Sequence, residues 1–524
     1  MNITTLFVAI CCSVMAAAQP YNFAPVDKLL SDSARAMGGL QGKTATVILS
    51  PTATLFTKAT GVFTADSVVP IASSSKWLSG AVIMSLVDAG KLSLDDSCGK
   101  YLTTFNGSKA GITIRQLMSH TSGLPGNTGF ESNRSLTLSQ AVDSIGLTTT
   151  LLSTPGTQFR YGGASMHVAG RIVEIIEGKP WDSVFAERIA RPLGMTLTDY
   201  EGLGQTDNPQ IAGGARSSAN EYARFLTMLL NKGLYNGKRI LSEQSVVIMS
   251  GDQTRGAAIV SSPFDAYQQY DTNMAKSRYG IGNWVEMPTK SSGVVYDNSS
   301  QGAFGFSPWI DWNRNVAGVI SVRSLMRNVT PTYITLKLLL RNIIDTAKQP
   351  ANNYELTVTN GYGGGRYKAG DTVHIFARAM QANEVFGEWL NDANLVFSES
   401  RNEWHVSFIM PSANVNCTAT FRPLDTAAVR IRYEQIRGEA ENKNVYYSFP
   451  PAMQGVAFLL HGSGGSARGW LPNNIENVQF VKDLLADSIG VIITECEERT
   501  LDRDVNGDGK IRWYVSAPLM DSSI

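Results

Sequence analysis

Three blocks of different sequence texture follow one another along this 524-residue chain, and this succession constrains the fold more than any other feature. Residues 22–347 mix amphipathic helical patterns with short apolar runs. Residues 354–423 alternate apolar and polar side chains around a glycine cluster, which is typical of β-hairpins. Residues 429–524 begin with a buried strand that runs into a glycine-rich turn. The length and the change of texture predict several domains, with a linker near residues 347–353.

The first block combines helices and strands without regular alternation, which predicts an α+β fold. Apolar residues recur there at helical spacing, and strand-like apolar runs lie near both ends of the block. The predicted helices are 75–90, 164–177, 181–190, 218–232 and 331–346, and the predicted strands are 44–50 and 316–322. Charged residues make up 17% of the chain and apolar ones 43%, so the chain can build cores.

A serine-rich segment, PIASSSKWLSGA at residues 70–81, opens the first of these helices. A helix N-terminus has free backbone N–H groups and the positive end of the dipole, and both favour an oxyanion. A serine hydroxyl needs a base to attack a carbonyl, and a lysine of lowered pKa can be that base. Residues i and i+3 share a helix face, so the spacing pairs Ser73 with Lys76. Ser74 and Ser75 point elsewhere. Ser-x-x-Lys alone is also compatible with an ordinary helix cap.

Further segments follow in a fixed order, and together with Ser-x-x-Lys they resemble the superfamily of serine β-lactamases and penicillin-binding proteins. The resemblance is greatest to class C β-lactamases, their esterase relatives and D-stereospecific peptidases, and it covers residues 25–346. The segments that carry it are ITIRQLMSHTSGLPG (112–126), PGTQFRYGGASMHVAGRIVE (155–174), IAGGARSSANEYARFLTMLLNKG (211–233), YGIGNW (279–284) and SSQGAFGFSPWID (299–311). It implies a catalytic domain in which helices flank an antiparallel sheet and a helical subdomain stands beside it.

The resemblance also implies roles for residues at matching positions. Ser73 is the nucleophile and Lys76 its partner. Tyr161, in Tyr161-Gly162-Gly163, matches the tyrosine that works with the lysine as general base and then as acid to the leaving group. Gly163 stands where the family has an asparagine, so a side-chain amide contact to the substrate is missing from that position. Gly163 remains a predicted point of substrate contact.

The third family element, Lys-Thr-Gly or His-x-Gly, is here Ser300-Gln301-Gly302, and the resemblance implies substrate contacts at these three residues. The family's cation helps to hold a substrate carboxylate, and Ser300 replaces it. The sequence therefore favours a neutral ester or amide over an anionic β-lactam or D-alanyl peptide. The backbone N–H groups of Ser73 and Ala303 form the implied oxyanion hole.

Five other polar or aromatic residues near these motifs are interpreted as structural. The alternative for His120 is a catalytic role as the histidine of a triad. The alternative for the two tryptophans is a platform on which the substrate lies. The five residues are His120, Arg160, His167, Trp309 and Trp312.

The two later blocks carry resemblances of their own. Residues 354–423 resemble the divergent internalin-type bacterial repeat through GYGGGRYKAGDTV, FGEWLND and FIMPSANVNCTATF, which implies a β spacer or, alternatively, carbohydrate or cell-surface contact. Residues 429–524 resemble the N-terminal part of a secreted α/β-hydrolase, with His461-Gly462 in its oxyanion loop. No G-x-S-x-G occurs in the sequence, so this block is interpreted as a truncated and inactive partial α/β-hydrolase-like segment.

A calcium-loop spacing occurs at residues 502–511, DRDVNGDGKI, with Asp504, Asn506 and Asp508 at its first three ligand positions. Val515 stands where a full EF-hand has a glutamate. The expectation is a polar turn, with weak calcium binding as the alternative. The predicted catalytic mechanism needs no metal and no cofactor.

The N-terminal segment MNITTLFVAICCSVMAAAQP is an apolar run that ends in small residues, which predicts a signal peptide over residues 1–18 and a secreted or periplasmic protein. Lys+Arg and Asp+Glu number 45 each, so nucleic acid is not an expected partner. Cys98, Cys417 and Cys496 are far apart in sequence and predict neither a disulfide framework nor a metal site.

These observations predict a serine hydrolase that forms an acyl-enzyme on Ser73 and cleaves a small-molecule ester or amide or a peptide. A β-lactamase-like carboxylesterase is the first expectation. A D-stereospecific peptidase, carboxypeptidase or β-lactamase is the alternative within the same class. A catalytically silent surface-binding protein is the alternative from another class, and the lost cation at Ser300 favours it.

Overall fold

The computed structural model describes the chain in nine segments, which fall into two compact units. The described residues are 21–36, 43–264, 277–286, 297–347, 354–378, 384–423, 432–437, 442–460 and 475–494. The first unit comprises the chain up to Ala379 with residues 391–399 and 405–417, and the second comprises the rest. The predicted signal peptide, the His461-Gly462 loop and the candidate calcium loop lie outside the described residues.

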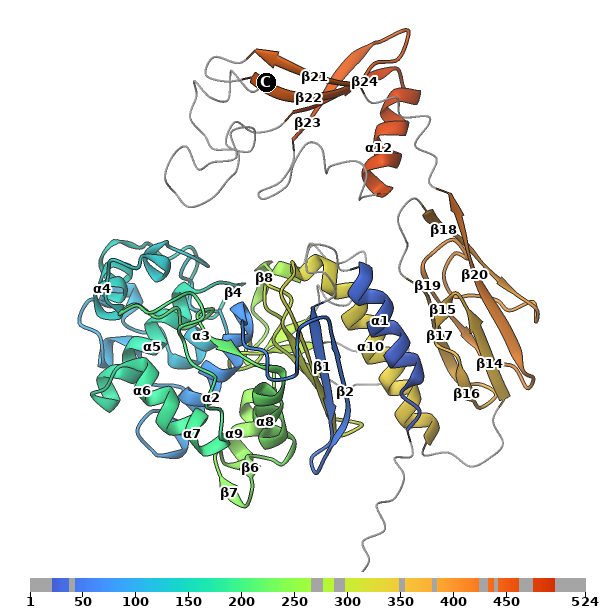
Figure 1. Cartoon of the computed structure of the whole chain (residues 1–524). Coiled ribbons are helices and arrows are strands. Elements are labelled where there is room, and N and C mark those ends of the chain that lie inside the picture. The colour runs from blue at the N-terminus through green and yellow to red at the C-terminus, as the bar shows by residue number, and fades with distance from the viewer. Residues whose placement is uncertain are drawn as a thin grey trace, which may run out of the picture. The chain divides into compact units, whose positions relative to one another are not determined.

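A seven-stranded antiparallel sheet stands at the centre of the first unit (Figure 1). Its order is β2-β1-β13-β12-β11-β10-β9, so the N-terminal hairpin pairs with the strands that come last in the first block. The bounds, in that order, are Thr54–Thr60, Thr44–Leu49, Val316–Val322, Ser307–Asp311, Asp297–Ser299, Trp284–Glu286 and Arg278–Tyr279. β1 and β13 are buried at every position. Figure 1 shows the reason: α8 (Ala219–Leu230) covers one face, and α1 (Ala24–Ala36) with α10 (Met326–Ala347) covers the other.

A helical subdomain is inserted between β2 and β9. Besides α8, its helices are α2 (Ser75–Asp88), α3 (Ile114–Met118), α4 (Leu138–Thr148), α5 (Ala164–Glu177), α6 (Trp181–Phe185), α7 (Arg191–Leu193) and α9 (Glu243–Ser250). Three short strand pairs join them: β3 (Val69–Pro70) with β5 (Arg216–Ser217), β4 (Gln158–Arg160) with β8 (Ala258–Ser261), and β6 (Leu234–Tyr235) with β7 (Lys238–Arg239). The periodicity predicts one apolar face for α2, but its residues are buried on all sides from Ser75 to Leu86. The difference arises because α5, α6 and α9 surround it.

The other predicted elements agree with the structure except at two helices. α5 and β13 have the predicted bounds, and β1 and α8 differ from them by one or two residues. The segment 181–190 divides into α6 and a π-helical turn, Ala186–Ala190. α10 begins at Met326, five residues before the predicted start, and Pro331 lies inside it. Proline is typical of a first helical turn, which explains the late predicted start.

Strands make up the described part of the second block, as the alternating pattern predicts. They are β14 (Tyr354–Thr359), β15 (Gly361–Tyr362), β16 (Gly365–Tyr367), β17 (Thr372–Ala377), β18 (Glu384–Asn391), β19 (His405–Ile409) and β20 (Val415–Pro423). They form two sheets, ordered β16-β14-β20-β18 and β15-β17-β19. The glycine cluster allows a close approach of backbones, because a Cβ on Gly363 would lie 2.4 Å from the carbonyl oxygen of His374.

The described part of the third block forms a mixed sheet with the order β21-β22-β24-β23. The strands are β21 (Arg432–Arg437), β22 (Asn442–Ser448), β23 (Gly455–Leu460) and β24 (Ile489–Thr494). β23 and β24 are parallel, and α12 (Ile475–Ala486) lies between them in sequence, as the predicted α/β unit requires. The other strand pairs are antiparallel.

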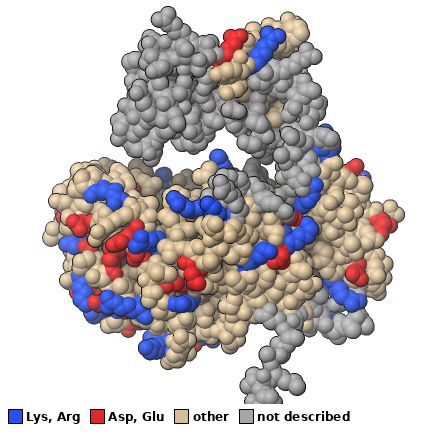
Figure 2. All heavy atoms as spheres, in the orientation of Figure 1, with Lys and Arg blue, Asp and Glu red and all other residues tan. Residues whose placement is uncertain are grey.

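The described residues add three observations on the surface, the cysteines and the helices. Figure 2 shows Lys and Arg side chains interspersed with Asp and Glu over the visible face of the first unit. Cys98 and Cys417 are buried free thiols. Of the helices described, none has the length and apolar character needed to cross a membrane.

Candidate active site

The three serines of residues 73–75 lie where a short 3-10 turn, Ala72–Ser74, leads into α2. The Ser74 hydroxyl donates a hydrogen bond to the carbonyl oxygen of Ser300, and the Ser75 hydroxyl donates to that of Ala72 at 2.6 Å. Both side chains are fully buried and are therefore engaged in holding the fold. Ser73 is the partly exposed member of the three, and it faces Lys76.

The backbone before Ser73 adopts a conformation that an L-residue rarely takes. Ala72 has a φ of +44° and is buried. Gly302 packs directly against this segment, since a Cβ on Gly302 would lie only 2.2 Å from the carbonyl oxygen of Ile71. Strained residues of this kind persist where surrounding packing enforces them, and they cluster at active sites. Tertiary packing, rather than local preference, thus fixes the position of Ser73.

Lys76 is buried beside Ser73 and makes three contacts. Its Nζ lies 3.0 Å from Ser73 Oγ and 2.7 Å from the carbonyl oxygen of Ala212, and it stands 4.7 Å from the centroid of the Tyr161 ring. Burial lowers the pKa of Lys76 to about 7, because a desolvated ammonium is disfavoured. A substantial fraction of Lys76 is therefore a neutral amine near neutral pH, and a neutral amine can accept the Ser73 proton.

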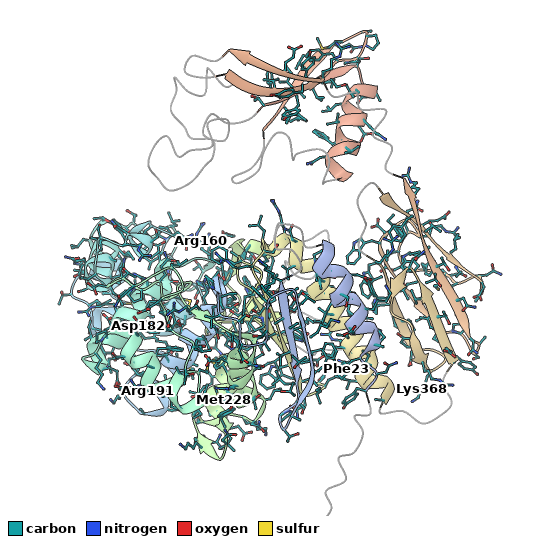
Figure 3. The ribbon with its side chains drawn as sticks, viewed as in Figure 1. Phe23, Arg160, Asp182, Arg191, Met228 and Lys368 are labelled. Atoms are coloured by element: carbon teal, nitrogen blue, oxygen red, sulfur yellow. The ribbon has the colours of Figure 1, made fainter. Side chains whose placement is uncertain are left out.

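Tyr161 follows β4 (Gln158–Arg160), whose last residue is labelled in Figure 3. The Tyr161 ring stacks on Trp284 at 5.1 Å between centroids and meets Tyr279 edge-on at 5.9 Å. Burial raises the pKa of Tyr161 to about 12, and hydrogen bonding to Ser73 and Tyr279 acts in the opposite direction. Tyr161 is consequently a neutral phenol at neutral pH, suited to donate a proton.

The third motif lies on the segment that follows β11. The Ser300 hydroxyl donates to the carbonyl oxygen of Ser73 at 3.1 Å, so this serine stands in the site without supplying a charge. Ala303 is exposed, and its N–H and that of Ser73 have no hydrogen-bond acceptor among the described residues. Two unpaired N–H groups near a nucleophile can bind an oxyanion. The Gln301 side chain donates to Glu286 Oε1 at 3.4 Å, and the substrate contact at this residue stays a prediction.

An amide group lies beside Gly163 although residue 163 has no side chain. Asn127 Oδ1 accepts a hydrogen bond from the Gly163 N–H at 2.9 Å, and Asn127 is exposed. Gly126 makes this possible, because a Cβ on Gly126 would lie 2.5 Å from the carbonyl oxygen of Tyr161. The sequence prediction missed Asn127, since its proximity to Gly163 arises from this tertiary contact between backbones. The glycine and asparagine of GLPGN are the only local signal.

His120 lies behind the site and not beside Ser73. Its ring contacts those of Tyr161 and Tyr279, with centroids 4.9 Å and 4.7 Å away, and its Nδ1 lies 3.4 Å from Ser165 Oγ. Burial, with the charge of Lys76, lowers the pKa of His120 well below its usual range. Its arrangement agrees with the structural interpretation and not with a triad.

The remaining residues interpreted as structural are packed or hydrogen-bonded within the fold. His167 Nε2 lies 2.7 Å from Asn208 Oδ1, and Arg160 donates to Gln158 Oε1 at 2.8 Å. Trp309 is buried against Tyr333, with the rings edge-to-face at 5.7 Å. The indole of Trp312 donates to Asn298.

A Ser-x-x-Lys pair at the start of a buried helix, between an antiparallel sheet and a helical subdomain, characterises the serine hydrolases that include β-lactamases and penicillin-binding proteins. The chain belongs to the β-lactamase family, whose model matches residues 44–333. The divergent InlB B-repeat domain matches residues 354–424, which confirms the predicted repeat.

Individual relatives agree with this assignment. A solved structure from Bacteroides dorei, provisionally described as a β-lactamase, has a TM-score of 0.54 and 32% identity, covering 62% of this chain and 99% of that one. Penicillin-binding protein 4 of Amycolatopsis lactamdurans is 27% identical over 300 residues, which are 50% of this chain and 74% of the relative. The D-alanyl-D-alanine-carboxypeptidase/endopeptidase AmpH of Escherichia coli is 26% identical over 269 residues, 46% of this chain and 66% of the relative.

Proposed function

We propose that this protein is a serine hydrolase that cleaves a carboxylic ester through an acyl-enzyme on Ser73. The observation that carries the proposal is the position of the Lys76 amine, 3.0 Å from the Ser73 hydroxyl, with a pKa lowered by burial to about 7. A lysine held at this distance and in this protonation range can activate a serine. The same geometry argues against a catalytically silent surface-binding protein.

The acylation step follows from the positions of the three side chains. Ser73 Oγ attacks the substrate carbonyl carbon while its proton passes to the neutral amine of Lys76. The carbonyl oxygen becomes an oxyanion held by the N–H groups of Ser73 and Ala303. As the bond to the leaving group breaks, Tyr161 gives its proton to the departing oxygen. The ammonium of Lys76 and the phenolate of Tyr161 then exchange a proton, which restores both groups.

Deacylation uses the same groups with water as the nucleophile. Lys76 takes a proton from the water, whose oxygen forms the new bond to the acyl carbon, and Ser73 Oγ leaves and regains its proton. The acid product departs, and Ser73 and Lys76 return to their starting states.

The choice of an ester over a carboxylate-bearing substrate rests on Ser300. Its hydroxyl donates to the backbone of Ser73 and offers no charge to a substrate carboxylate. The lysine of α10, Lys337, forms ion pairs with Glu286 and Asp297 and is therefore engaged elsewhere. D-alanyl peptide hydrolysis is the second candidate, because the relative AmpH is a D-alanyl-D-alanine carboxypeptidase/endopeptidase. From the sequence we also propose that the protein is exported and that its repeat binds a surface.

Turnover of two substrates tests the proposal. We expect the protein to hydrolyse p-nitrophenyl pentanoate and to hydrolyse a chromogenic cephalosporin at least ~100-fold more slowly by kcat/KM. Ser73→Ala should abolish the ester activity. Ser108→Ala, at an exposed serine of a surface turn, is the matched control and should retain it. Equal ester turnover by Ser73→Ala and the native protein would refute the assignment of the nucleophile.

A further inference from the structure

Behind the strand that carries the third motif lies a row of buried charges that the catalytic scheme does not use. β11 and the residues after it alternate in direction: the side chain of Ser300 meets the backbone of Ser73, whereas Asp297, Ser299 and Gln301 face α10. Glu286, on the neighbouring strand β10, points to the same side. The two faces of one strand therefore serve the nucleophile and a set of ionic contacts.

Glu286 is the centre of these contacts. Its carboxylate accepts hydrogen bonds from the Ser299 hydroxyl, from the Tyr333 hydroxyl at 2.9 Å and from Gln301 Nε2 at 3.4 Å. Lys337 of α10 forms an ion pair with the same carboxylate. We name Glu286 with these four partners the carboxylate clamp. The side chains of Glu286 and Lys337 are 12% and 9% exposed, so water competes little for these bonds.

The ionic contacts continue along α10 away from the strand. Lys337 also contacts Asp297 at 2.8 Å, and Arg341 pairs with both Asp297 and Asp311. Asp297 thus has a second cation besides Lys337. This matters for the design of variants, because Asp297 keeps Arg341 as its positive partner when Lys337 and the Glu286 carboxylate are removed together.

The clamp acts on the segment that presents the oxyanion-hole N–H. Gln301 stands two residues before Ala303, and the intervening Gly302 is pressed against Ile71 with space for no side chain. The Gly302 N–H also donates to the carbonyl oxygen of Phe306 at 2.8 Å. The segment is therefore fixed by the site on one face and by Glu286 on the other. Sub-ångström displacement of an oxyanion donor weakens transition-state binding more than it weakens folding.

We propose that Glu286 is a positioning residue for the oxyanion hole, holding the N–H of Ala303 toward the site through Ser299 and Gln301. The proposal rests on the proposed function, because an oxyanion hole has meaning only if Ser73 attacks a carbonyl. Glu286 touches no reacting atom, and its effect is transmitted by the strand.

Two double variants separate positioning from stability. Glu286→Met with Lys337→Met removes the clamp and the buried ion pair together, and well-packed apolar replacements of buried ion pairs commonly keep the fold. Glu286→Gln with Lys337→Met removes the charges but retains an oxygen that accepts from Ser299, Tyr333 and Gln301. Asp345→Asn is the control, since it breaks an ion pair of α10 with Arg314 and touches neither Glu286 nor β11.

The readout is the ratio of kcat/KM for an ester to that for its thionoester, measured on p-nitrophenyl pentanoate and its C=S analogue. Sulfur accepts hydrogen bonds poorly, so the ratio reports the oxyanion hole and is insensitive to the amount of folded protein. We expect the variant with Glu286→Met and Lys337→Met (the Met/Met variant) to lower this ratio at least ~10-fold. The variant with Glu286→Gln and Lys337→Met (the Gln/Met variant) and Asp345→Asn should stay within ~3-fold of the native value.

Three results would overturn the proposal: an unchanged ratio in the Met/Met variant, an equal fall in both double variants, or a native protein without ester turnover. The last result also refutes the proposed function, whereas the first two leave it intact. If the Met/Met variant does not fold, Gln301→Leu takes its place, because it removes one clamp contact without removing a charge. Its ratio is then expected to fall, and an unchanged ratio contradicts the proposal.

Discussion

The Nζ atom of Lys76 lies 3.0 Å from Oγ of Ser73, at the point where the 3-10 turn that holds the serine leads into the buried helix that holds the lysine. The same nitrogen contacts the carbonyl oxygen of Ala212 and stands over the ring of Tyr161. Among the described residues no carboxylate contacts this nitrogen, so burial dominates and lowers the lysine pKa to about 7. The chemistry of the site, its pH dependence and its cost in stability all follow from this arrangement.

The first prediction concerns the pH dependence of acylation. Because the neutral amine is the base, kcat/KM for p-nitrophenyl pentanoate should rise about tenfold per pH unit below pH 7 and level off above it. Lys76→Arg cannot lose its proton in this range and should be nearly inactive at all these pH values. A native profile that is flat between pH 5.5 and 8 would contradict the role of Lys76.

The second prediction concerns stability. Lys76 has a folded-state pKa of about 7, below its ordinary value of 10.5, so between these values the unfolded chain binds a proton that the folded protein does not. Stability therefore rises with pH across this window, and the full cost of burying the charge is present below about pH 7.

Lys76→Met removes that cost. We expect this variant to be more stable than the native protein at pH 7 by a few kcal/mol, since one pKa unit corresponds to about 1.4 kcal/mol and the lost Nζ hydrogen bonds offset part of the gain. The advantage should shrink as the pH approaches 10. Denaturant unfolding at pH 7 and pH 9.5 measures both values, and a variant less stable than the native protein at pH 7 speaks against a buried, destabilising lysine.

The third prediction separates the roles of Lys76 and Tyr161. If Tyr161 donates the proton to the leaving group, Tyr161→Phe should slow hydrolysis of an alkyl ester by ~10²- to 10⁴-fold but that of a p-nitrophenyl ester by less than ~10-fold, because p-nitrophenolate leaves without a proton. The phenylalanine ring retains the stacking surface toward Trp284. Equal losses on both substrates would instead favour a role for Tyr161 as the base.

The fourth prediction concerns Asn127. Its Oδ1 is occupied by the N–H of Gly163, which is a donor only, so the Nδ2 donors point away from Gly163. A substrate with an amide carbonyl in its acyl chain can accept from them. Asn127→Ala should therefore lower kcat/KM for N-acetylglycine p-nitrophenyl ester about tenfold relative to the pentanoate. Asn106→Ala, at an exposed asparagine of a surface turn, is the control. Equal effects of Asn127→Ala on the two esters would exclude this contact.

The Ser73–Lys76 pair could be predicted from the sequence because residues three apart share a helix face and the family resemblance favours a catalytic pair over a cap. The π-helical turn after α6 and the burial of α2 on all sides could not be predicted from the sequence, because both depend on the packing of neighbouring helices. Tyr161 required the family resemblance, because nothing local links it to Lys76.

Asn127 and Glu286 escaped prediction for a different physical reason. Asn127 reaches Gly163 through a backbone contact between two glycine-containing segments, and Glu286 meets Gln301 and Lys337 only after β10, β11 and α10 have packed. Gln301 is assigned to the substrate side from its place in the motif. The motif alone did not reveal the contact of its side chain with Glu286, which depends on the packing of the neighbouring strand β10.

Covalent labelling of Ser73 tests the central claim most directly. The folded protein is incubated with a fluorophosphonate probe, its intact mass is measured, and the modified peptide is sequenced by fragmentation. The account predicts one adduct per chain, located on Ser73, present in Ser108→Ala and absent from Ser73→Ala. An unmodified native protein, or an adduct that persists at another residue in Ser73→Ala, would contradict it.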